Sequence, residues 1–214
     1  MIYITDKYKQ TNTIMLVHIY RLFVLFVCGY LNHKVIISPN HQSEMGTKEG
    51  DQPFEGGEAG KHNIVRICQT SIMLLLSVYN ANHYLYFLNY TEILLVLVLV
   101  LGYIMRIKCF SQLGHMFTFG LGIRKDHQLI KTGMYTYLVH PSYTAQFMVH
   151  YSYWALLLLG SNLLFNVMFV LLILYSLYML RYRTRLEEQM MMKRFGKEYK
   201  EYMSSRYRFI PYLI

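Results

Sequence analysis

Two long apolar segments stand side by side in the second half of the chain, Tyr143–Leu159 and Asn162–Tyr182. A short turn around Gly160 and Ser161 separates them, which is typical of two antiparallel helices. A glycine-rich polar loop precedes this pair and the charged run Arg181–Tyr202 follows it. The pattern predicts a helical hairpin whose loop and charged exit meet at one end, on the same side of a membrane.

Composition favours a small integral membrane protein over a soluble domain. Of the 214 residues, 54% are hydrophobic and 15% are charged, and the mean hydropathy is +0.23. Soluble domains average about 25% charged residues, so the charge is low for a soluble chain. Helices that cross the hydrocarbon core need about 20 apolar residues. We therefore predict an all-α, polytopic membrane protein with about five spans: Ile14–Leu31, Ile64–Leu88, Glu92–Ile107, Tyr143–Leu159 and Asn162–Tyr182.

The net charge of +9 is distributed in a way that points to lipid and not to nucleic acid. Lys and Arg cluster beside the apolar runs, at 106–131 and 181–208. Cytoplasmic loops of membrane proteins carry such an excess. The loop and the C-terminus are accordingly predicted to be cytosolic, with the bilayer as a partner, whereas the topology before residue 90 stays open. The three cysteines have no metal-ligand spacing, so neither a metal site nor a disulfide framework is expected.

The chain divides into two parts. Residues 1–104 hold the first membrane helices and a polar, glycine-rich loop at 38–63, to which no chemistry is assigned. Residues 105–214 hold the glycine-rich loop, the hairpin and the charged helix. The second part carries the candidate functional residues.

The charged exit allows two interpretations. Arg183 and Glu187 lie four residues apart, on one face of a helix. A salt-bridged, solvated helix end with snorkelling arginines explains the pattern. Periodicity alone favours this first interpretation. The alternative is a site that holds a zwitterionic cofactor and an anionic substrate, and spacing does not decide between the two.

The end of the polar loop is the second signal. His140 precedes Pro141, and an X-Pro step favours a turn followed by a helix start. The amides at such a start favour a carboxylate. Tyr135, Tyr137 and Tyr143 offer rings for an adenine or a sulfonium, or an interfacial aromatic belt.

Several segments in order and spacing resemble the isoprenylcysteine carboxyl methyltransferases. They are LGHMFTFG (113–120), HQLIKTGMYTYLVHPSY (127–143), RTRLEEQMMMKRFGKEYKEY (183–202) and FIP (209–211). The resemblance covers about residues 105–211. It implies a membrane enzyme, in the endoplasmic reticulum, that uses S-adenosylmethionine to methylate the C-terminal carboxylate of prenylated cysteine. Its partners would be prenylated CaaX-type proteins after proteolytic trimming.

The resemblance also implies roles for individual residues. Arg183 would orient the substrate carboxylate, and Glu187 would hold the cofactor; both count as catalytic. Two loop segments would contact the cofactor as well: His127, Gln128, Leu129, Ile130 and Tyr135, and then His140, Pro141, Ser142 and Tyr143. An ionised carboxylate needs no general base to attack a sulfonium methyl, so positioning would supply most of the catalysis.

One position departs from the family pattern. Val139 stands where an arginine usually precedes His-Pro, which would weaken cofactor binding, mark another substrate or mark a lost activity. Ala145 replaces a common glycine. Three alternatives therefore stay open: a phosphatidylethanolamine-type N-methyltransferase with His127 or Glu188 as base, a membrane NADPH-dependent sterol reductase-like protein, and a catalytically decayed family member. The turn His140–Tyr143 argues against the reductase.

Overall fold

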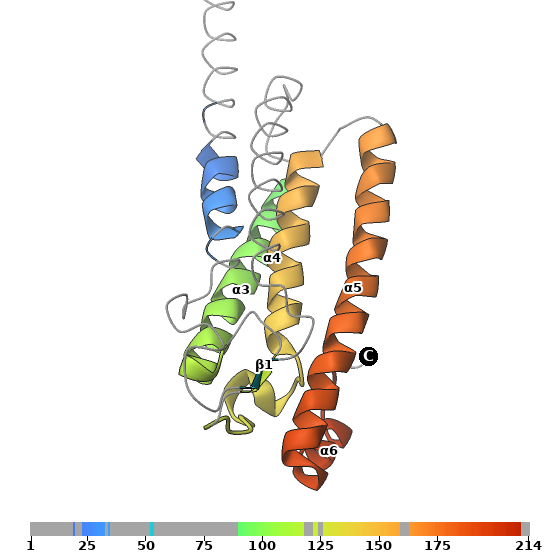
Figure 1. Ribbon diagram of the computed structural model, residues 1–214. Helices are drawn as coiled ribbons and strands as arrows, with labels where there is room; N and C mark the ends of the chain where they lie inside the picture. Colours follow the sequence, from blue (N-terminus) through green and yellow to red (C-terminus); the bar gives the residue numbers. More distant parts are fainter. Residues whose placement is uncertain are drawn as a thin grey trace, which may run out of the picture.

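The computed structural model describes residues 19, 23–32, 34, 52–53, 90–117, 122–123, 126–158 and 163–210. Three long helices dominate these residues: α3 (Tyr90–Leu113), α4 (Pro141–Leu158) and α5 (Leu163–Phe195). They lie lengthwise beside one another with a shorter N-terminal helix, Phe23–Asn32, against the outer side (Figure 1). The loop between α3 and α4 gathers at one end of the bundle together with α6 (Lys197–Ser204).

Helices α3 and α4 approach each other closely because small residues face each other. A Cβ atom added to Gly102 of α3 would lie 2.6 Å from the Cβ of Met148 and 3.0 Å from the carbonyl oxygen of Ala145. Ala145 itself is fully buried. Small residues at such crossings let backbones approach, as is common between membrane helices. The alanine in place of a common glycine is therefore compatible with this contact.

The apolar core lies between α3, α4 and the N-terminal helix. Leu99, Val149, Tyr153 and Leu157 are buried there with Cys28 from the N-terminal helix. Phe169 of α5 packs against the same cluster, and its ring centroid lies 6.3 Å from that of Tyr151 on α4.

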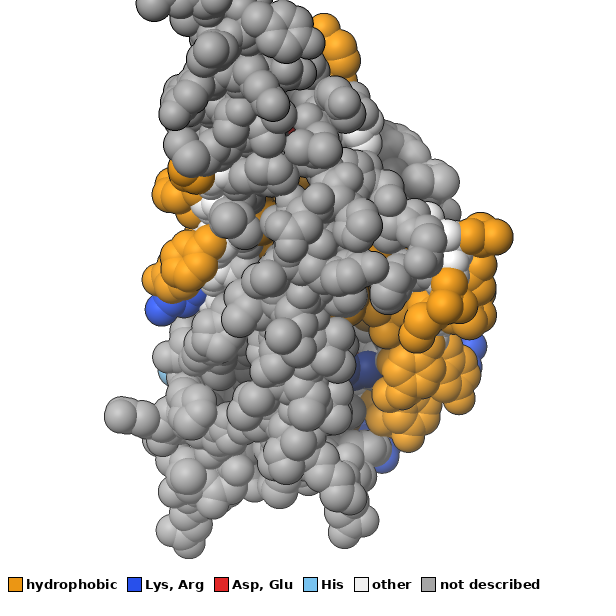
Figure 2. All heavy atoms as spheres, turned by 90° about the horizontal axis from the view of Figure 1, so that it is seen from above, with side chains coloured by type: hydrophobic (Ala, Val, Ile, Leu, Met, Phe, Trp, Pro, Cys, Tyr) orange, Lys and Arg blue, Asp and Glu red, His pale blue; other side chains and the backbone are white. Residues whose placement is uncertain are grey.

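Helix α5 is much longer than a bilayer is thick. Its 33 residues span roughly 50 Å at 1.5 Å per residue, against a hydrocarbon core of about 30 Å. The apolar part and the charged part form one continuous helix, as the predicted helical exit requires. Most side chains of the apolar part are exposed, and Figure 2 shows hydrophobic side chains on the outer side of the molecule near α5.

Two described helices are long and apolar enough to cross a membrane by length and composition, Tyr90–Met116 and Asn166–Phe195. They contain most of the third and fifth predicted spans. The fourth predicted span corresponds to α4, which begins two residues earlier, at Pro141. Of the first span, Phe23–Asn32 is described as an apolar helix, whereas the second span, Ile64–Leu88, lies outside the described residues. The number of spans therefore stays a prediction.

The described part is helical, with two small exceptions to the all-α expectation. Gln52–Pro53 (β1), within the predicted 38–63 loop, pairs antiparallel with Gly122–Ile123 (β2). Leu138 forms an isolated parallel bridge with Tyr207. This second pairing matters for the site, because it ties the C-terminal segment to the end of the loop.

Candidate active site

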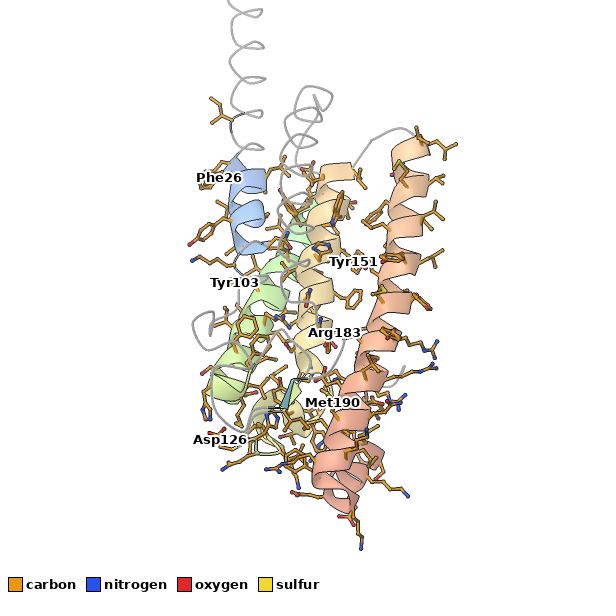
Figure 3. The ribbon with its side chains drawn as sticks, in the orientation of Figure 1. Phe26, Tyr103, Asp126, Tyr151, Arg183 and Met190 are labelled. Atoms are coloured by element: carbon orange, nitrogen blue, oxygen red, sulfur yellow. The ribbon has the colours of Figure 1, made fainter. Side chains whose placement is uncertain are left out.

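The hydroxyl of Tyr143 joins the two residues of the charged exit. It accepts a hydrogen bond of 2.8 Å from Nε of Arg183 and donates one of 2.9 Å to Oε2 of Glu187. Tyr143 lies in the first turn of α4, and Arg183 and Glu187 lie one turn apart on α5. Arg183 comes from the half of α5 nearer the loop, below Tyr151 in Figure 3. The exit residues are therefore part of an inter-helix site and not only a solvated helix end.

His140 occupies the junction between the loop and α4, as the His-Pro step predicts. Its side chain is buried, and Nε2 lies 3.1 Å from Oε1 of Glu188. Because a carboxylate only accepts, Nε2 is the donor. The ring stacks on Phe209, with centroids 5.5 Å apart, and Arg208 Nη2 lies 3.2 Å from the other oxygen of Glu188. The imidazole is thus held by a hydrogen bond at Nε2 and by a stacked ring on one face.

The two adjacent glutamates have different surroundings. The Glu188 side chain is 14% exposed and lies between His140 and Arg208. The Glu187 side chain is 36% exposed, and its Oε1 lies 3.9 Å from Nδ1 of His140. Because Glu187 is the more accessible carboxylate, it is the one that suits a further cationic partner. Glu188 is engaged in holding the turn.

The C-terminal segment 207–209 holds the His140 turn by hydrogen bonds. Amide hydrogens of Val139 and His140 donate to the carbonyl oxygens of Tyr207 (2.8 Å) and Arg208 (3.0 Å). The Thr144 hydroxyl donates to the carbonyl of Phe209 at 2.7 Å. Sequence analysis connected Phe209 with the site only through the FIP motif. The contacts show that residues 207–209 form one wall of the His140 turn.

A tyrosine of α6 holds the loop itself. The Tyr202 hydroxyl donates to the carbonyl oxygens of Tyr135 (3.0 Å) and Leu138 (3.2 Å). Burial raises the pKa of Tyr202 to about 12. This phenol therefore stays a donor across the neutral range and keeps the loop closed onto α6.

The first predicted cofactor segment, which begins at His127, packs near the C-terminal end of α5, beyond Glu187. The rings of His127 and Phe195 have centroids 6.1 Å apart, and Phe195 is eight residues beyond Glu187. The backbone amide of Gln128 donates to the sulfur of Met116 at 3.3 Å, and Leu129 packs near Val139. Ile130 is half-buried. The second predicted segment contacts Arg183 and Glu187 directly, through Tyr143 and His140.

The three predicted aromatic residues of the turn differ in exposure. Tyr135 is 8% exposed, and burial raises its pKa above the usual value. Tyr137 is 69% exposed. Tyr143, described above, is the one whose hydroxyl lies between Arg183 and Glu187.

Val139 packs in an apolar cluster beside this site. Its side chain is buried with Tyr199 and Tyr202 of α6, and Leu129 and Phe195 pack against the same cluster. This cluster is apolar apart from the phenol groups, which suits valine. The substitution of the family's usual arginine thus belongs to the packing between the loop and α6.

One cation that the sequence places at the membrane interface is buried in the structure. Arg106 was interpreted as a flanking membrane-interface charge, but it is 2% exposed and lies inside the bundle. Its Nη1 donates to the carbonyl oxygen of Ser142 at 2.7 Å and also to the Ser142 hydroxyl. A charged residue within an apolar helix often faces other helices, but at the end of an apolar run an arginine also reaches water by snorkelling. The sequence alone therefore did not distinguish the two placements. Arg106 contacts the α4 start directly.

Comparison with known proteins agrees with this arrangement. Residues 94–193 match the model of the isoprenylcysteine carboxyl methyltransferase (ICMT) family. The protein-S-isoprenylcysteine O-methyltransferase of Saccharomyces cerevisiae is 34% identical over 123 residues, which are 55% of this chain and 47% of that protein. The chain thus spans about half the length of this curated relative.

A solved structure has a similar fold. It is that of the eukaryotic intramembrane Ras methyltransferase ICMT, without a monobody. The match has a TM-score of 0.54 at 20% identity and covers 73% of this chain and 54% of that one. The resemblance predicted from the loop and exit motifs is confirmed, because residues 94–193 match the model of the isoprenylcysteine carboxyl methyltransferase family.

Proposed function

We propose that this protein is an integral membrane enzyme that methylates the C-terminal carboxylate of a prenylated cysteine. The methyl donor in this proposal is S-adenosylmethionine. The observation that carries the proposal is the pairing of Arg183 and Glu187 through the Tyr143 hydroxyl, at the end of the bundle where the loop gathers. The family match of residues 94–193 supports the same reaction.

The residues present fit both ligands. A sulfonium cofactor with an amino group needs an accessible carboxylate, which Glu187 offers. A substrate carboxylate needs a cation with planar donors, which Arg183 offers. S-adenosylmethionine, when bound, supplies an electrophilic methyl group. His140, Ser142 and Tyr143 line the α4 side of this arrangement, and His127, Gln128, Leu129, Ile130 and Tyr135 are proposed to complete the cofactor site from the loop.

The protein's contribution to the reaction is mainly positional. Arg183 would orient the substrate carboxylate, and the bound cofactor would supply the methyl group. The ionised carboxylate would accept it without proton transfer as the methyl–sulfur bond breaks and S-adenosylhomocysteine leaves. Opposite charges cancel as the ester forms, so a site with little water lowers the barrier. His140 donates to Glu188 and is thereby held in place, without acting as a base. Arg183 and Tyr143 act together because Tyr143 also holds Glu187.

The partners follow from this chemistry. We propose prenylated CaaX-type proteins, trimmed to expose the prenylcysteine carboxylate, as substrates. The membrane would receive the prenyl chain, and we place the protein in the endoplasmic reticulum with its C-terminus in the cytosol. Protease protection of a C-terminal tag in sealed microsomes tests the orientation: a lumenal tag contradicts it.

Methyl transfer from labelled S-adenosylmethionine tests the function. Membranes containing the protein are offered a farnesylated cysteine and, separately, phosphatidylethanolamine. We expect base-labile methyl ester on the prenylcysteine, abolished by Glu187→Gln and retained in the matched control Glu201→Gln on α6. Label in the phospholipid would assign the protein to N-methyltransferases. Label in neither acceptor, from folded protein, would identify a decayed enzyme.

A further inference from the structure

Arg106 is buried inside the helix bundle, unlike an arginine that extends to the membrane interface. Its guanidinium carbon is 4.7 Å from the ring centroid of Phe110 and 5.4 Å from that of Phe117. These aromatic rings lie at the loop end of α3 and just beyond it. A cation over aromatic faces is held away from water. The side chain therefore has one orientation, inward toward α4.

The guanidinium makes a two-point contact with the first turn of α4. One nitrogen, Nη1, bonds to both the carbonyl oxygen and the hydroxyl of Ser142. Hydrogen bonds from a charged group to partly desolvated acceptors are among the stronger ones in proteins. Ser142 is the second residue of α4, and Tyr143 is the third. The contact thus fixes the backbone that carries the Tyr143 phenol.

A second contact between α3 and α4, at Gly102, leaves α4 free to rotate about its own axis, and the Arg106 contact prevents that rotation. Gly102, one turn before Arg106, sets how closely α3 approaches α4 at Ala145. A contact between small residues limits separation but does not by itself fix rotation about the α4 axis. The polar contact at Ser142 does so, because both acceptors belong to one residue.

We propose that Arg106 is a positioning residue for the methyl transfer: through Ser142 it holds the Tyr143 hydroxyl between Arg183 and Glu187. This inference rests on the proposed function. It predicts a signature that neither Arg183 nor Glu187 shares. Arg183 serves the substrate and Glu187 the cofactor, whereas displacement of Tyr143 affects both. Loss of Arg106 should therefore weaken the binding of both the cofactor and the substrate.

A double-mutant cycle tests this route. Arg106→Met, Tyr143→Phe and the double variant are purified in detergent. Binding of S-adenosylhomocysteine is measured by calorimetry, and the apparent KM for farnesylcysteine by methyl transfer. We expect each single change to weaken S-adenosylhomocysteine binding and to raise the KM for farnesylcysteine by about tenfold each. This is the cost of one hydrogen bond to a charged group. The double variant should be no weaker than the weaker single variant.

Two further variants keep the test decisive. Lys108→Met, at an exposed position of the same helix, controls for loss of positive charge and should match the wild type. If Arg106→Met does not fold, Ser142→Ala takes its place in the cycle, because it removes one acceptor of the same contact. Its effect should likewise disappear in the Tyr143→Phe background.

The outcomes separate the inference from the function. Losses that multiply in the double variant, or Arg106→Met affecting only one ligand, would overturn the positioning role. Folded Arg106→Met with unchanged S-adenosylhomocysteine binding and unchanged KM for farnesylcysteine would also overturn the positioning role. The proposed function would still stand in that case, provided that the wild type is active. A wild type that neither binds S-adenosylhomocysteine nor methylates farnesylcysteine would overturn the proposed function itself.

Discussion

The Tyr143 hydroxyl donates a 2.9 Å hydrogen bond to Oε2 of Glu187, across the contact between α4 and α5. The same oxygen accepts from Arg183. A phenol placed between a guanidinium and a carboxylate keeps the two charged groups at a fixed separation. In the proposed reaction these groups hold the substrate and the cofactor, so one hydroxyl sets the distance between the reacting molecules.

Removal of this hydroxyl should therefore affect both ligands. Tyr143→Phe loses two charge-assisted hydrogen bonds, and we expect kcat/KM to fall by about 10- to 100-fold. The KM values for S-adenosylmethionine and for farnesylcysteine should both rise. The control is Tyr182→Phe, an exposed tyrosine next to Arg183. An increase in only one KM would contradict the bridging role.

Introducing the family's usual arginine at position 139 should not increase activity. Val139 is buried against Tyr199 and Tyr202, so Val139→Arg places a charge in that cluster. We expect a loss of about 3 kcal/mol of stability, a cost typical of an unpaired buried charge. Thermal unfolding in detergent measures it, with Tyr137→Arg, at a 69% exposed position, as the control. A large gain in activity with unchanged stability would instead support a decayed enzyme.

Two glycines that share a positive φ test the contact between Gly133 and Gln112. Gly133 has φ +62° and Gly196 has φ +52°. A Cβ atom at Gly133 would collide with the amide of Gln112, whereas one at Gly196 meets nothing within 4 Å. Both alanine variants lose stability because a side chain is strained at positive φ. Gly133→Ala also displaces the Gln112 side chain, whose Oε1 accepts a 3.2 Å hydrogen bond from the Met134 amide, at a cost of about 1 kcal/mol. Equal unfolding temperatures would contradict the Gln112 contact.

The loop anchor should weaken in alkaline solution. The pKa of Tyr202 rises from its usual value to about 12 in the folded protein because of burial. Between about pH 10 and 12 the unfolded state therefore binds fewer protons at this group than the folded state does, and stability falls as pH rises. Tyr202→Phe should be less stable at neutral pH but should show a shallower alkaline decline. Parallel declines in thermal unfolding would contradict the assignment.

The helices were the most predictable part of the fold. Hydrophobic length and the Gly160 turn predicted α4 and the start of α5 to within a few residues, and Pro141 marked the α4 start. Helix α5 continues to Phe195, beyond the predicted span that ended at Tyr182. The pairing of Leu138 with Tyr207 could not be predicted in the same way. It joins segments about 70 residues apart, and neither segment has a strand pattern. Periodicity describes single elements, whereas such a contact depends on where the whole chain returns.

The site was predictable in its residues but less so in its contacts. The spacing of Arg183 and Glu187 suggested a direct pair, yet the structure places Tyr143 between them. Arg106 shows the main limit. An arginine near the end of an apolar run either extends to water or turns inward, and its own sequence context is the same in both cases. The inward orientation of Arg106 depends on its hydrogen bond to Ser142, which lies on another helix.

The most direct test of the central claim separates the roles of Arg183 and Glu187 by steady-state kinetics. Arg183→Ala and Glu187→Ala are compared with the matched controls Arg181→Ala and Glu201→Ala, using farnesylcysteine and S-adenosylmethionine as varied substrates. We predict that Arg183→Ala mainly raises KM for farnesylcysteine, and that Glu187→Ala mainly raises KM for S-adenosylmethionine. Full activity with unchanged KM values in both variants would contradict the account.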